Sequence, residues 1–170
     1  MELIAFGGKE HKGIDRPLKL LVPIDYYGFL SKTNGGIALA SSEKIQIPKT
    51  TAKVAPHIFL GADIARKNYD MEHVTGLYKA QLQWDSVIFA IDFDENYFFF
   101  GRTGVYYWDI TNKYSGDGEK IYFVSSSFAD FIKAFGGIDV LDTPERRSLL
   151  DQALKVIQQK PTKHNKHGGK

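Results

Sequence analysis

Carboxylate side chains are concentrated in one stretch of the sequence, residues 85–119. This stretch carries seven acids against two basic residues, a local balance of −5. The acids are Asp85, Asp92, Asp94, Glu95, Asp109, Asp117 and Glu119. A surface of this charge attracts basic protein partners and repels the phosphate backbone of nucleic acids. The sequence therefore predicts a binding surface for a basic protein, with no direct nucleic-acid contact.

Aromatic residues in the same stretch are candidates for contact energy, because Tyr and Trp dominate protein interfaces. On a strand, Tyr106 and Trp108 share one face and Tyr107 takes the other. One of these faces must be core, and the sequence leaves open which one. The predicted partner-binding set is Asp85, Asp94, Glu95, Tyr97, Tyr107, Asp109, Asp117 and Glu119.

A calcium site is the first alternative for these acids. Asp92-x-Asp94-x-Asn96 begins like a calcium-binding loop, which then needs a glycine and, six residues later, a glutamate. Tyr97 and Thr103 occupy those two places. The stretch is more typical of a hairpin turn than of a metal loop.

Catalysis is the second alternative, and the sequence offers it little support. There is no cysteine, which excludes thiolate zinc sites, disulfides and cysteine nucleophiles. Residues 125–127 are serines without the glycines of a nucleophile elbow, and His11, His57 and His73 stand in no recognisable motif. We therefore predict a binding protein, not an enzyme, with no cofactor and no metal.

The elements that would position these residues begin with a helix over 23–33. Pro23 suits the first helical position, and Ile24, Tyr27 and Leu30 indicate an apolar face. The following Asn34-Gly35-Gly36 is typical of a left-handed helix end. Further helices are predicted over 71–83, 128–135 and 143–159.

Short strands separated by turns make up most of the remainder. Leu18 and residues 20–22 are strand-like, and clearer strands are predicted over 37–39, 44–47, 57–61, 87–91, 97–100, 105–108 and 121–124. β-Branched and aromatic runs divided by Gly, Asp and Asn indicate an antiparallel meander. Strands bracketed by helices predict the α+β class.

The chain length of 170 residues suggests a single domain, which we place at residues 1–159. Residues 160–170 hold four lysines and no acid and are expected to form a basic, disordered tail. The N-terminus lacks the segments of a signal peptide, and no apolar run approaches the ~20 residues that span a bilayer. We therefore expect a cytoplasmic protein that does not bind membranes.

Four segments, at 22–36, 88–93, 104–109 and 126–132, together resemble the SUKH superfamily. They read Val-Pro-Ile-Asp-Tyr-Tyr-Gly-Phe-Leu followed by Asn-Gly-Gly, Ile-Phe-Ala-Ile-Asp-Phe, Gly-Val-Tyr-Tyr-Trp-Asp and Ser-Ser-Phe-Ala-Asp-Phe-Ile. The resemblance implies a curved antiparallel sheet backed by helices, here with an extra C-terminal helix.

The resemblance also implies a function. Bacterial members of the superfamily are typically immunity proteins, which bind and neutralise a cognate polymorphic or contact-dependent toxin; many of those toxins are nucleases or deaminases. The superfamily brings no established catalytic residues. The alternative, implied by its eukaryotic members, is a regulatory or scaffold interaction module.

Overall fold

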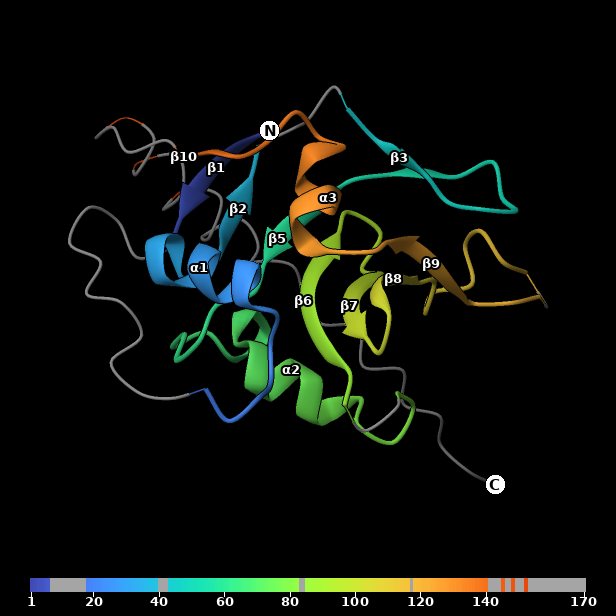
Figure 1. The fold of residues 1–170 in the computed structure, drawn as a ribbon, viewed down its shortest axis with the longest axis horizontal. Helices are drawn as coiled ribbons and strands as arrows, with labels where there is room; N and C mark the ends of the chain where they lie inside the picture. The colour runs from blue at the N-terminus through green and yellow to red at the C-terminus, as the bar shows by residue number, and fades with distance from the viewer. Residues whose placement is uncertain are drawn as a thin grey trace.

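A large sheet forms the body of the protein, and its first and third helices lie together on one face (Figure 1). The computed structural model describes residues 1–6, 18–39, 43–82, 85–116 and 118–140, and singly residues 145, 148 and 152. The helices are α1 (Ile24–Thr33), α2 (Met71–Leu77) and α3 (Phe128–Lys133), with a 3₁₀ turn, η1, at Lys67–Tyr69. The strands of the first half are β1 (Glu2–Ala5), β2 (Gly36–Ala38), β3 (Ile45–Gln46), β4 (Lys53–Val54) and β5 (Pro56–Phe59). Those of the second half are β6 (Val87–Asp92), β7 (Tyr97–Gly101), β8 (Gly104–Trp108), β9 (Ile121–Ser125) and β10 (Asp139–Val140).

Eight of these strands form the main sheet, in the order β10-β1-β2-β5-β6-β7-β8-β9, and β3 and β4 form a separate hairpin. Every neighbouring pair in the main sheet is antiparallel except β1 and β10. Register shifts between β5 and β6, β6 and β7, and β8 and β9 mark bulges, which bend and twist strands. The predicted α+β class is confirmed, and the sheet is mixed, not purely antiparallel.

The N-terminal strand is where the prediction of the elements was wrong. The strand lies at Glu2–Ala5, where it pairs with both β2 and β10, and residues 18–22 form no regular element. The α-amino group of Met1 also donates to the carbonyls of Phe135 and Gly137. These partners lie at the other end of the sequence, so local patterning could not have revealed them.

Aromatic side chains of the core pack between the sheet and the helices α1 and α3. Phe89 of β6 stacks on Phe100 at 4.2 Å between ring centroids and meets Phe131 of α3 edge-on at 5.5 Å. Tyr26 of α1 lies edge-on to Phe128 at 4.9 Å. These rings are all buried, and such contacts stabilise beyond the area they remove from water.

The turn after α1 is a left-handed helix end, as predicted. Asn34 has a φ of 52° and its N–H donates to the carbonyl of Leu30. Its side-chain amide exchanges two hydrogen bonds with the backbone of Ala62, at 2.9 and 2.7 Å. At Gly35, which has a φ of 80°, an added Cβ would collide with the carbonyl oxygen of Phe59. The segment therefore ties α1 to the loop after β5, and only glycine fits at its second position.

The remaining helices agree with the prediction in place and differ in length. Asp70 caps α2 by accepting from the N–H of His73 at 2.9 Å, and the helix ends at Leu77, short of the predicted residue 83. Ser127 caps α3 by accepting from the N–H of Asp130 at 3.0 Å. Glu145, Ser148 and Gln152 are helical, within the predicted 143–159 helix. The rest of that helix and the predicted tail 160–170 lie outside the described residues.

Candidate functional site

Tyr107, predicted to contact a partner, lies in the interior. Its side chain is fully buried, and its hydroxyl donates to Asp92 Oδ2 at 2.7 Å. Asp92 Oδ1 accepts from the N–H groups of Asp94 and Asn96. Burial raises the pKa of Asp92, and the hydrogen bonds from Tyr107 and the turn oppose that rise. The sequence left open which face of the 105–108 strand is core, and the structure places Tyr107 in the core. The Asp92 carboxylate stabilises the predicted hairpin turn at 92–96.

Asp109 is likewise buried and organises a loop, so its predicted place on a binding surface is wrong. Its carboxylate accepts from the N–H groups of Lys113, Tyr114 and Ser115 and from the Ser115 hydroxyl. Burial alone would raise the pKa of Asp109, but these hydrogen bonds outweigh it and the pKa is lowered. The charge faces the protein's own backbone and is not available to a partner.

Two further acids of the predicted set are paired with lysines. Lys113 Nζ lies 2.6 Å from Asp94 Oδ1, and Tyr114 donates to the other oxygen at 2.6 Å. Lys49, on the β3–β4 hairpin, lies 3.0 Å from Glu119 Oε2. The second pair joins residues that are 70 positions apart, so it could not be predicted from the sequence.

The remaining residues of the predicted partner-binding set differ in their exposure. Asp85 and Glu95 are exposed. Tyr97 is half-buried, and its hydroxyl donates to that of Tyr78 at 3.1 Å. Asp117 lies outside the described residues. Of the described acids of 85–119, Asp92 and Asp109 are thus buried, Asp94 and Glu119 are paired with lysines, and Asp85 and Glu95 are exposed.

The residues that could anchor a partner are instead on and before α1. The helix buries Tyr26, Leu30 and Thr33, and the Tyr26 hydroxyl donates to the carbonyl of Leu60 at 2.8 Å. This choice of inner face turns Ile24 outward, against the predicted apolar face. Spacings of four and three residues from 26 to 30 to 33 mark the buried stripe, so the sequence held a signal for it.

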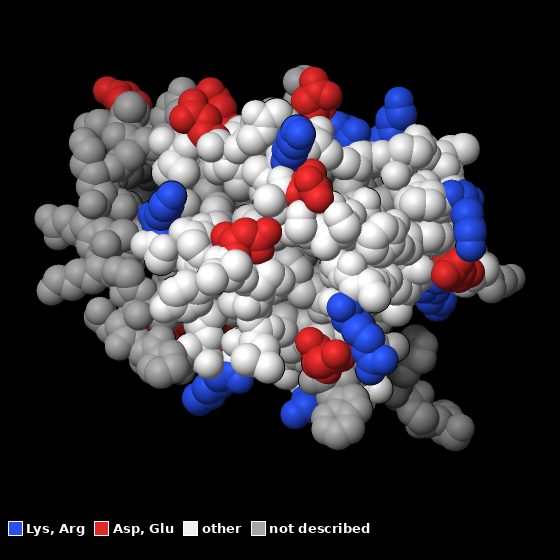
Figure 2. Space-filling view, viewed as in Figure 1, with Lys and Arg blue, Asp and Glu red and all other residues white. Residues whose placement is uncertain are grey.

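Three apolar side chains, Leu21, Ile24 and Tyr27, make up what we call the α1 patch. Their exposed fractions are 93%, 89% and 42%. Ile24 and Tyr27 lie three residues apart on one side of the helix. Figure 2 shows the face of the molecule on which α1 and α3 lie, where uncharged surface surrounds a few separate acidic and basic side chains. Ile24 and Tyr27 lie on α1 and Leu21 lies just before it, and apolar side chains this exposed are typical of an interaction site.

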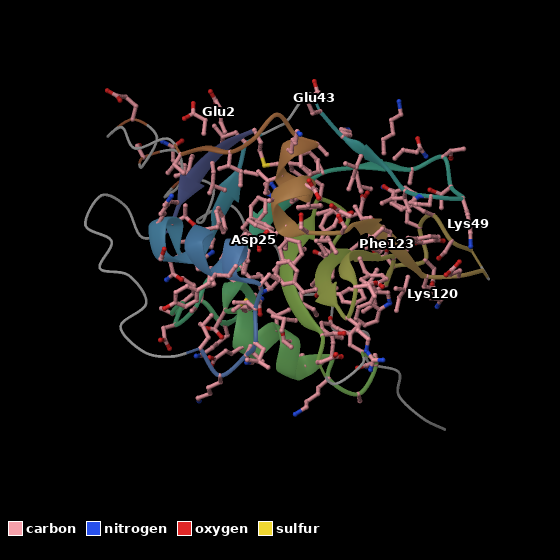
Figure 3. All side chains as sticks on the ribbon, viewed as in Figure 1. Glu2, Asp25, Glu43, Lys49, Lys120 and Phe123 are labelled. Atoms are coloured by element: carbon pink, nitrogen blue, oxygen red, sulfur yellow. The ribbon has the colours of Figure 1, made fainter. Side chains whose placement is uncertain are left out.

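The α1 patch is held in place by the contact between α1 and α3. Asp25 Oδ2 accepts from the N–H of Ala129, in the first turn of α3, at 2.9 Å, and Asp25 Oδ1 accepts from the N–H of Tyr26. Figure 3 shows Asp25 at the start of α1, beneath α3. Asp130, exposed on α3, accepts from the hydroxyls of Ser126 and Ser127, which lower its pKa. The start of α1, which carries the patch residue Ile24, is thus tied to the first turn of α3 by the Asp25 carboxylate.

Catalytic and metal-binding arrangements receive no support from the described residues. Among them, no group of three or more His, Cys, Asp or Glu side chains could hold a metal ion. The ring of His57 stacks on that of Phe93, with 3.9 Å between the ring centroids. This is a stacking contact and not the hydrogen bond of a catalytic pair. No helix in this part of the chain combines the length and the apolar character needed to cross a membrane.

Comparison with known proteins places the fold in a family. The sequence model of the SMI1 / KNR4 family (SUKH-1) matches residues 14–134, which include α1, the α1 patch and most of the sheet. No curated protein and no solved structure matches the chain. The SUKH family is linked to immunity proteins. Since the match spans well over half of the sequence, the chain belongs to the SMI1 / KNR4 family (SUKH-1).

Proposed function

We propose that this protein is a non-enzymatic immunity protein that binds a cognate toxin in the cytoplasm and neutralises it by docking. The observation that carries the proposal is the α1 patch, in which Leu21, just before α1, and Ile24, its first residue, are almost wholly exposed. Family membership supports the immunity role. The docking surface in this proposal differs from the acidic stretch that the sequence suggested.

The chemistry of the patch defines the kind of toxin surface that fits it. Burying an exposed Leu or Ile contributes about 1.5–3 kcal/mol, so the patch supplies affinity. The exposed Asp130 on α3, the helix that contacts α1, would favour a toxin surface with basic side chains near an apolar one, because charge complementarity selects the partner and speeds association. A basic toxin thus remains the proposed partner, now at a different surface.

The test combines capture with inhibition. The tagged protein is used to capture partners from its source cells, and the captured protein is then expressed in a host with and without the immunity candidate. The proposal expects a toxin whose growth inhibition is relieved by the wild-type protein but much less by the Leu21→Ser/Ile24→Ser variant. Both changes are at exposed positions, so the fold is expected to survive them.

Val140→Ser is the matched control, because Val140 is an exposed apolar residue on β10, outside the patch. It should relieve toxicity as well as the wild type. A captured partner that is not toxic, and whose binding is constitutive, would support the regulatory or scaffold alternative instead. Relief of toxicity that is equal for the patch variant and the wild type would contradict the α1 patch as the docking surface.

A further inference from the structure

The two edges of the main sheet differ in a way that points to a second contact. One edge, β10, has only two residues. The other, β9, reads Ile-Tyr-Phe-Val-Ser over five residues, without a charge or a proline. Proteins usually protect exposed edge strands with charges, prolines or short length, because an unprotected edge pairs with other strands. Only the β10 edge follows that rule.

The hydrogen-bond pattern shows which backbone groups of β9 face outward. The N–H of Asp109 donates to the carbonyl of Lys120 at 2.8 Å, which makes these residues a hydrogen-bonded pair. Such pairs alternate along antiparallel strands, so Tyr122 bonds with Tyr107 and the residues on either side of it do not bond with β8. The N–H and C=O groups of Ile121 and Phe123 therefore point to the free edge, where no other strand of the described chain pairs with them.

The side chain of Phe123 adds an apolar contact beside those groups. Its ring is 47% exposed and ends a row of aromatic rings that crosses three strands. Tyr106 stacks on Phe99 at 5.4 Å and meets Phe123 edge-on at 5.5 Å. Figure 3 shows Phe123 on β9, between α3 and the end of the molecule where Lys49 and Lys120 lie. A strand added to β9 would continue this row.

We propose that β9 pairs antiparallel with β9 of a second copy of this chain, centred on Tyr122. In that register the outward N–H and C=O groups of Ile121 bond with those of Phe123 in the second copy, and those of Phe123 bond with those of Ile121 in the second copy. Each Phe123 ring then packs against an Ile121 side chain, an aromatic–β-branched pair that stabilises sheets. The two-fold axis runs perpendicular to the sheet, so the α1 and α3 helices of both copies lie on the same side.

Charge favours the antiparallel arrangement. Lys120 is exposed at the start of β9, and Asp130 is exposed on α3, just beyond the end of β9. Tyr122 points to the side of the sheet that α3 covers, and so does Lys120, two residues away. Antiparallel pairing brings Lys120 toward Asp130 of the second copy at both ends of the interface. Parallel pairing in register would instead set Lys120 beside Lys120.

The experiment measures the molar mass of the purified full chain by light scattering over a concentration series. The chain has a mass of 19.2 kDa, and the proposal expects the measured mass to rise toward twice that value. Phe123→Lys should abolish the rise. Lys120→Glu and Asp130→Lys should each raise the dimer dissociation constant about tenfold, and the Lys120→Glu/Asp130→Lys double variant should restore it, which a misfolded protein could not do.

Lys32→Glu, an exposed lysine in the last turn of α1, is the control and should leave the dimer unchanged. A mass that stays at that of one chain at every concentration would overturn the proposal. A dimer that persists in the folded Phe123→Lys variant, as judged by circular dichroism, would overturn the assignment to β9. Failure of the double variant to recover dimerisation would refute the antiparallel arrangement.

Discussion

Removal of the Tyr107 hydroxyl tests whether its hydrogen bond to Asp92 stabilises the hairpin turn. Tyr107→Phe leaves the ring in its buried place and deletes the 2.7 Å hydrogen bond to Asp92 Oδ2. Hydrogen bonds to charged groups contribute about 1.5–3 kcal/mol, and the site is buried, so we expect a loss in unfolding free energy of that size at neutral pH.

The loss of unfolding free energy caused by Tyr107→Phe should depend on pH, and the structure predicts the direction of that dependence. The pKa of Asp92 is raised by burial and held down in part by Tyr107. Without the hydroxyl the pKa of Asp92 rises further, so the ionised carboxylate becomes less favourable in the folded state. The loss is therefore largest at neutral pH and shrinks as the pH falls and Asp92 takes up a proton.

Urea unfolding of the wild type and the variant at several pH values measures both effects. Tyr106→Phe is the matched control, because its hydroxyl bonds only to Thr103 at an exposed position, 2.5 Å away; we expect it to cost about 0.5 kcal/mol or less. A Tyr107→Phe variant no less stable than Tyr106→Phe, or with a loss that grows toward acid pH, would refute the reasoning.

Four other changes test the loop at Asp109, the turn at Gly35 against the helical Gly76, and the half-buried imidazole of His57 by the same unfolding assay. Asp109→Asn should lower stability most at neutral pH, and the difference should shrink as the pH falls below the ordinary pKa of 3.8, because the folded pKa of Asp109 is lowered. Gly35→Ala should cost about 1–3 kcal/mol, since its backbone is left-handed and an added Cβ has no room, whereas Gly76→Ala, in open space within α2, should gain about 0.5–1 kcal/mol. Burial lowers the pKa of His57 and opposes its protonation in the folded state, so the wild type should lose stability as the pH falls below 6.5. His57→Phe should remove that loss. Identical pH profiles of stability for the two proteins would contradict this.

Much of the fold was predictable because its signals are local. The helix before Asn34, the meander from Val87 to Trp108 and the Ser127 cap all depend on neighbouring residues. The strands β1 and β10 escaped prediction because each is short and depends on a partner more than 130 residues away. Short apolar segments carry no periodicity from which such pairing could be inferred.

The exposure of the acidic residues was predicted less well, and for a physical reason. Counting charges along the sequence treats every acid of 85–119 as exposed, yet Asp92 and Asp109 are buried against backbone donors. Glu119 meets Lys49, 70 residues away in sequence. On α1, Ile24 was assigned to the apolar face because it is apolar. The inner face instead carries Tyr26, whose hydroxyl donates to the buried carbonyls of Leu60 and Phe89.

The affinity of the captured toxin for three forms of this protein tests the central claim most directly. By titration calorimetry, Leu21→Ser/Ile24→Ser should raise the Kd by about 100-fold or more, because two apolar side chains at about 1.5–3 kcal/mol each are lost from the interface. Val140→Ser and the reversal of the two exposed acids, Asp85→Lys/Glu95→Lys, should leave the Kd within about threefold. An unchanged Kd for the α1 patch variant, together with a weakened Asp85→Lys/Glu95→Lys variant, would contradict the account and return the binding surface to the acidic stretch.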